Sequence, residues 1–108
     1  MRVFNHNLAM RLTPDQIEAI KGAARTVLGD GARVTLFGSR TNDARRGGDI
    51  DLMFETPRNL DNCVVVAGQL YVALIRSLGE RKIDVVLKDA ATAEAPVMRV
   101  ARETGVAL

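Results

Sequence analysis

One stretch, residues 36–52, constrains the fold of this chain more than any other. It runs from the apolar end of a predicted strand through a Gly-Ser turn and, ten residues beyond Ser39, reaches Asp-Ile-Asp. Residues i and i+2 of a strand project to the same face, so Asp49 and Asp51 should project together while Ile50 faces a core. Two adjacent carboxylates repel each other unless a cation lies between them, and hard oxygen ligands suit Mg²⁺. The pattern predicts a metal-dependent phosphoryl-transfer site.

A third aspartate, Asp84, lies within a later apolar segment, Lys-Ile-Asp-Val-Val-Leu. Alternation places it on the opposite face of its strand from Ile83 and Val85. If this strand neighbours the strand of Asp49 and Asp51, the three carboxylates converge on one patch, as two-metal phosphoryl transfer requires. A purely structural interpretation stays open, because Asp49 follows two glycines and could mark a turn, and Asp84 could lie on the exposed face of an edge strand.

Small and basic residues accompany the acids. Gly38 allows a close backbone approach, and Ser39 offers a hydroxyl and an amide to a terminal phosphate. Arg40 is a further candidate for phosphate contact, with a solvated loop charge as the alternative. Cations around acidic metal ligands are what a triphosphate substrate needs. Four more cations lie near the acids in sequence: Arg45, Arg46, Arg81 and Lys82.

The periodicity of the chain predicts an α/β fold in which a small mixed sheet of three or four strands packs with helices. The predicted helices cover residues 14–28, a segment from a cap at Asn59 or Asp61 to residue 78, and residues 96–104; the predicted strands cover residues 33–37, 49–55 and 81–87. The link between the first two strands is too short for a full crossover helix. The helix between the second and third strands permits parallel or antiparallel pairing. We expect the helices on one side of the sheet.

The composition is that of one compact domain, residues 1–108, with 47% hydrophobic residues and a net charge of +2. Because this charge is small and aromatic residues are sparse, direct nucleic-acid binding is not expected. Cys63, the single cysteine, allows no intrachain disulfide and indicates a reducing compartment. The chain shows no signal peptide and no apolar run long enough to span a bilayer, so we expect a cytoplasmic protein that does not contact membranes.

Two short segments carry a resemblance to a known family: Phe-Gly-Ser-Arg at residues 37–40 and Gly-Asp-Ile-Asp-Leu at residues 48–52. They resemble the signature of the DNA polymerase beta-like nucleotidyltransferases, and more narrowly the minimal nucleotidyltransferases, which often act as antitoxins to HEPN-domain toxins. Residues 100–108 also resemble the C-terminal helix and tail of these proteins. One position departs from their pattern, because Gly47-Gly48 stands where a serine commonly precedes the first aspartate.

The resemblance implies a site and a reaction. Gly38 and Ser39 would bind nucleotide phosphates, and the catalytic aspartates would carry two Mg²⁺ ions; these are Asp49, Asp51 and Asp84. The reaction would move a nucleoside monophosphate from ATP to a hydroxyl, a tyrosine of a partner HEPN-type toxin, so that the chain acts as an antitoxin. Two alternatives stay open: a non-catalytic antitoxin that occludes its partner, and a small-molecule nucleotidyltransferase.

The length of the chain bears on the acceptor. A nucleotidyltransferase core takes up nearly all 108 residues, so little chain remains to enclose a second substrate. We therefore expect the acceptor on the surface of another macromolecule, or a homo-oligomer in which a second subunit completes the pocket. The three aspartates favour the enzyme over the occluding antitoxin, because occlusion by itself places no demand on them.

Overall fold

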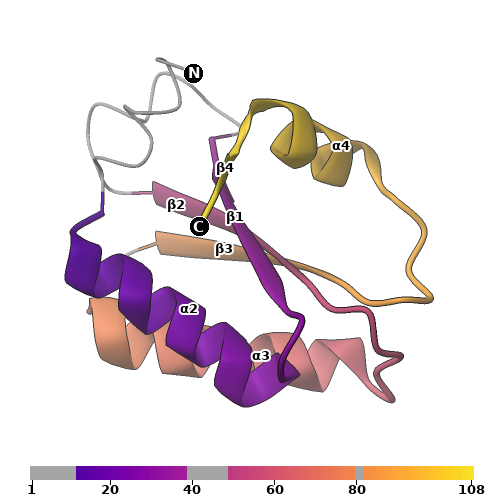
Figure 1. The fold of residues 1–108 in the computed structure, drawn as a ribbon, viewed down its shortest axis with the longest axis horizontal. Helices are drawn as coiled ribbons and strands as arrows, with labels where there is room; N and C mark the ends of the chain where they lie inside the picture. The colour runs from indigo at the N-terminus through magenta and orange to yellow at the C-terminus, as the bar shows by residue number, and fades with distance from the viewer. Residues whose placement is uncertain (1–11, 39–48, 80–81) are drawn as a thin grey trace.

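The computed structural model describes residues 12–38, 49–79 and 82–108, and within them three helices pack against a four-stranded mixed sheet (Figure 1). The helices are α2 (Pro14–Leu28), α3 (Cys63–Leu78) and α4 (Pro96–Thr104), and the strands are β1 (Arg33–Phe37), β2 (Asp49–Glu55), β3 (Lys82–Lys88) and β4 (Val106–Ala107). The predicted α/β fold with a mixed sheet is therefore confirmed. No helix among these residues has the length and apolar character that a membrane span requires.

The strand order is β3-β2-β1-β4, with one parallel pair. β1 pairs antiparallel with β2 and with β4, whereas β2 pairs parallel with β3. Helix α3 connects β2 to β3, and it supplies the crossover that a parallel pair needs. β4 is only two residues long and pairs with Thr35 and Leu36 of β1. Such a short strand has no alternating pattern of its own, which is why the sequence predicts only the helix before it.

Both faces of the sheet are covered, so the expectation of helices on one side is wrong. α2 and α3 pack on one face over the larger core, which includes Leu36, Leu52 and Phe54. α4 lies over the other face, above the sheet in Figure 1. The reason is that β1 and β2 also present large apolar side chains on this second face. A smaller cluster forms there: Phe37, Met53, Met98 and Ala101.

The helix ends follow local signals in one case and a distant contact in another. α2 begins where predicted, at a capping box in which the Gln16 amide donates to Thr13 Oγ1 at 3.1 Å and the Thr13 amide donates to Gln16 Oε1 at 2.9 Å. α3 is capped by Asn62, not by Asn59 or Asp61. Asn62 Oδ1 accepts from the Val65 amide at 3.2 Å. The Leu60 amide donates to Asp89 Oδ2 at 2.9 Å, and this bond keeps Leu60 out of a helix that would begin after Asn59.

The third strand also differs slightly from its predicted limits. β3 continues to Lys88, which pairs with Glu55, so it ends one residue later than expected. Its predicted first residue, Arg81, lies outside the described residues. The extension places the full length of β2 against β3 and fixes a seven-residue parallel register.

Candidate functional site

One row of residues crosses the sheet where β1 ends and where β2 and β3 begin (Figure 1). Phe37 pairs with Asp51 across the antiparallel ladder, and Asp51 pairs with Asp84 across the parallel one. Paired residues on neighbouring strands project to the same face, and the strands lie about 4.8 Å apart. Phe37 belongs to the cluster under α4. Asp51 and Asp84 therefore lie side by side on the face that α4 partly covers.

The two carboxylates have different surroundings. Asp51 is 9% exposed, between Phe37 on the neighbouring strand and Met53 two residues along its own, and both of these apolar residues are fully buried. Asp84 is exposed on β3, which lies at one edge of the described sheet. Electrostatic interactions are stronger in a buried environment than in bulk water. The row thus combines a carboxylate held by the core with one that solvent, or a second molecule, can reach.

The remaining predicted residues lie at the same end of the sheet or outside the described region. Gly38 follows β1 directly and is half-buried. The backbone of Asp49 begins β2, two residues before Asp51, but its side chain is not among those described. Ser39 and Arg40 lie outside the described residues, as do Arg45, Arg46 and the Gly47-Gly48 pair. Among the described side chains, no three acidic, histidine or cysteine residues gather as a metal-binding cluster.

Lys82 is a candidate that sequence reasoning noted only as a cation near Asp84. The register pairs Lys82 with Asp49 and sets it two residues before Asp84, on the same face of β3. Its side chain is exposed. An ammonium group beside the acidic row can attract the phosphates of a nucleotide. The signal in the sequence was the i, i+2 spacing of Lys82 and Asp84, which becomes informative once the neighbouring strand is known.

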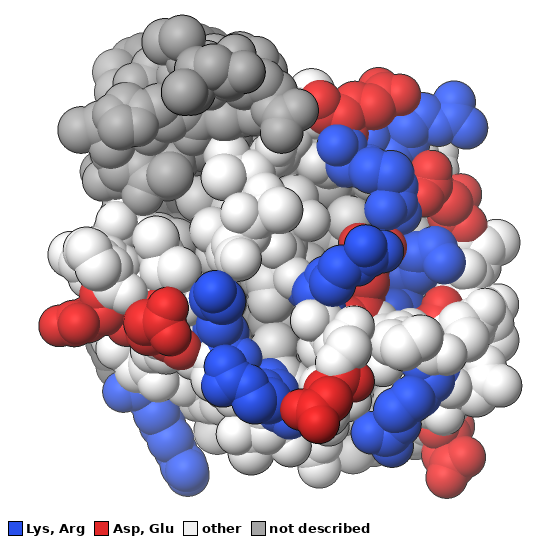
Figure 2. All heavy atoms as spheres, viewed as in Figure 1, with Lys and Arg blue, Asp and Glu red and all other residues white. Residues whose placement is uncertain are grey.

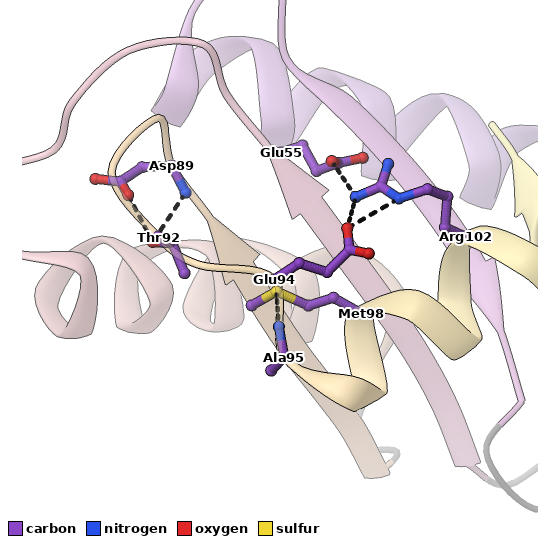
Figure 3. A network of polar contacts seen from close by, with 7 residues as sticks. All are labelled: Glu55, Asp89, Thr92, Glu94, Ala95, Met98 and Arg102. Atoms are coloured by element: carbon purple, nitrogen blue, oxygen red, sulfur yellow. Dashed lines mark hydrogen bonds and ion pairs between the residues drawn. The ribbon is translucent and has the colours of Figure 1, made fainter.

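An ion-pair network fastens α4 over the other end of the same face (Figure 3). Arg102 Nη2 donates to Glu55 Oε2 at 3.1 Å and to Glu94 Oε1 at 2.6 Å. The hydrogen bonds to Glu94 and then to Glu55 raise the pKa of Arg102 above its ordinary value. Glu55 lies four residues beyond Asp51 on β2, so the network attaches α4 to the opposite end of the strand that carries Asp51.

A second network organises the turn that follows β3. Asp89 is buried and accepts hydrogen bonds from the Thr92 hydroxyl at 2.6 Å, from the Leu60 amide at 2.9 Å and from the Ala91 amide at 3.1 Å. These bonds, with the one from Thr92 first, lower the pKa of Asp89 to about 2. Asp89 therefore acts as an anchor between the end of β3 and the approach to α3, remote from the Asp51–Asp84 pair.

Charge on the visible face is mixed in sign. Figure 2 shows Lys and Arg side chains interspersed with Asp and Glu across the described surface on this side. The described residues of this face consequently form no single basic surface, and the distinctive electrostatic feature of the sheet remains the in-register pair of Asp51 and Asp84.

Comparison with known families identifies the class of this fold. The family model of the nucleotidyltransferase domain matches residues 17–104, from the first turn of α2 to the last residue of α4. The chain therefore belongs to the nucleotidyltransferase domain family. Its members transfer nucleotidyl groups and generally use a nucleoside triphosphate and a divalent metal ion. No curated protein and no solved structure gives a significant match.

Proposed function

We propose that this chain is a Mg²⁺-dependent nucleotidyltransferase that moves a nucleoside monophosphate from ATP to a hydroxyl group. The register of Asp51 with Asp84 carries the proposal, because it brings acids from two strands to adjacent positions on one face. Membership of the nucleotidyltransferase domain family supports the class of reaction, and the pairing of Asp51 with Asp84 supports the location of the active site.

The donor set fits a hard divalent cation. Mg²⁺ prefers oxygen ligands, and a cation offsets the repulsion between two neighbouring carboxylates. Asp51 and Asp84 would hold the metal together with Asp49, and we propose two ions. Bound Mg²⁺ would neutralise charge on the phosphates and lower the pKa of the acceptor hydroxyl.

The candidate site residues would then have distinct roles. Gly38 and Ser39 would bind the phosphates, with Arg40 as an additional contact. Gly38 directly follows Phe37, which pairs with Asp51, so it lies beside the acidic row. Asp84 would serve the attacking hydroxyl as metal ligand or proton acceptor. Its exposure on β3 supports this assignment, since an acceptor must approach from solvent.

We further propose that the acceptor is a tyrosine of a HEPN-type toxin in the cytoplasm, and that the chain acts as the antitoxin. The likeness of residues 37–40 and 48–52 to the minimal nucleotidyltransferases supports this choice. The position of Asp84 supports it too, because a side chain of a second protein can reach a residue that is exposed on an edge strand of the described sheet.

The proposal is tested with Asp51→Asn and Asp84→Asn, scored separately for nucleotide binding and for transfer. Calorimetry with Mg-ATP should show binding lost in Asp51→Asn, because a ligand charge is removed, and nearly unchanged in Asp84→Asn. Intact-mass measurement of the HEPN-type partner should show nucleotide addition by the native chain and by neither variant. Asp30→Asn, an exposed acid in the turn before β1, is the matched control and should behave as the native chain.

Three outcomes would contradict parts of the proposal. Equal Mg-ATP affinity in the native chain and Asp51→Asn would remove Asp51 from the metal site. Transfer at the native rate by Asp84→Asn would make Asp84 a structural strand residue. Neutralisation of the toxin by Asp51→Asn, without any added nucleotide, would favour occlusion over catalysis.

A further inference from the structure

Helix α3 carries an apolar stripe that the described chain leaves uncovered. Val65 is 53% exposed and Val72 is 49% exposed. Their spacing of seven residues places them on one face of the helix, and Gly68 and Arg76 lie on the same face. These residues, with Gln69 and Ala73, line a shallow depression along the helix. A surface helix ordinarily turns polar side chains outward, so this face differs from the expected pattern.

Gly68, in the middle of the stripe, packs closely against no other part of the described chain. A Cβ added there would meet no atom within 4 Å, and Gly68 is not among the glycines with positive φ. Glycine inside a helix is less stable than alanine, so neither space nor backbone conformation accounts for it. A glycine on an exposed face does allow the backbone of a second helix to approach closely.

The stripe is complementary to itself. If two α3 helices pair antiparallel around a two-fold axis between Gly68 and Gln69, Val65 of one copy lies level with Val72 of the other. The same symmetry brings Arg76 to the N-terminal end of the partner helix, where Asp61 precedes the cap. Arg76 is the only charged residue in the α3 sequence, and Asp61 is an exposed acid just before the helix cap. Such a pairing would bring together two pairs of valines and place two pairs of opposite charges near each other.

We propose that a second copy of this chain docks on α3 in an isologous antiparallel dimer. Because α3 packs on the face of the sheet opposite α4, such a dimer would not cover the face that carries Asp51 and Asp84 in either copy. The segment from Val65 to Arg76 extends roughly 16 Å at the helical rise per residue. This is short for a standard interface, so the dimer should dissociate at micromolar concentration.

Sedimentation equilibrium of the full chain, from roughly 1 µM to roughly 1 mM, measures this association. The native chain should dimerise reversibly, and Val72→Glu should raise its dissociation constant at least about tenfold, by placing a charge in the apolar stripe. Val100→Glu is the matched control, since Val100 is 42% exposed on α4, and it should leave the constant unchanged.

A charge exchange gives a second test that does not depend on tolerance of the apolar stripe. Asp61→Arg and Arg76→Asp should each weaken the dimer, because each places like charges opposite one another, and the double variant should restore it. A native chain that stays monomeric throughout the range would overturn the proposal and leave the stripe to a different partner. Native association by Val72→Glu, or a double variant no better than the single ones, would overturn it as well.

Discussion

Substitution of Gly105 by alanine should loosen the attachment of α4 to the sheet. Gly105 follows α4 and lies against β1, where a Cβ would come within 2.5 Å of the Ala101 carbonyl oxygen, 2.5 Å of Thr35 Cγ2 and 2.8 Å of the Leu36 carbonyl oxygen. Ordinary van der Waals contact begins near 3.4 Å. Two of these three atoms belong to the backbone, so rotation of a side chain cannot relieve the overlap.

The cost follows from how far the neighbours must move. Restoring ordinary contact requires a separation of about 0.9 Å between Gly105 and atoms of both α4 and β1. This movement strains the pairing of Leu36 with Val106. Overpacking of this kind costs about 1–3 kcal/mol. In a chain of this size the loss should lower the melting temperature by about 5–15 °C.

Thermal and urea unfolding followed by circular dichroism would measure the effect. Gly22→Ala is the matched control, because Gly22 lies within α2 and a Cβ there meets no atom within 4 Å. It should raise the free energy of unfolding by about 0.5–1 kcal/mol. Replacement of glycine by alanine should therefore lower the free energy of unfolding at Gly105 and raise it at Gly22. Native stability of Gly105→Ala would refute the described packing of the α4 end on β1.

Two further substitutions test other contacts. Asp89, whose hydrogen bonds from Thr92 and Leu60 lower its pKa from 3.8 to about 2, stabilises the fold above pH 3.8 and loses that contribution as pH falls toward 2. Urea midpoints should therefore fall more steeply over that range in the native chain than in Asp89→Asn, and parallel profiles would contradict this role. Met98 is 7% exposed and packs with Phe37, so Met98→Ala should lower the free energy of unfolding by about 2–4 kcal/mol. Met98→Leu should keep most of that stability, and equal losses in both variants would contradict a packing role.

Local signals predicted most element boundaries correctly. The capping box at Thr13 and the positive φ of Gly29 set the two ends of α2, and both lie next to the residues they affect. The predicted start of α3 was wrong, and for Asn59 the cause is remote in sequence. The Leu60 amide donates to Asp89, 29 residues away, and this bond keeps Leu60 outside the helix that Asn62 caps. Periodicity carries no information on such a contact.

The candidate site also combines features that the sequence predicts with features that depend on distant parts of the chain. Alternation on each strand indicated that Asp51 faces away from Ile50, and Asp84 away from Ile83. It could not indicate that β2 and β3 are neighbours, that they run parallel, or that these two aspartates share one register position. A slip of a single residue would turn one carboxylate to the opposite face of the sheet. The sequence therefore identified the candidate residues, and the pairing of β2 with β3 brought two of them together.

The sequence by itself determined most of the strand and helix segments, the acidic character of one strand face and the family to which the chain belongs, because these depend mainly on residues close together in the chain. Only the tertiary structure decided that α4 covers the second face and that Lys82 lies beside the acidic row. It also left the α3 stripe uncovered by the other described residues. These features depend on which apolar surfaces meet, and that choice minimises exposed area over the whole chain rather than over any one segment.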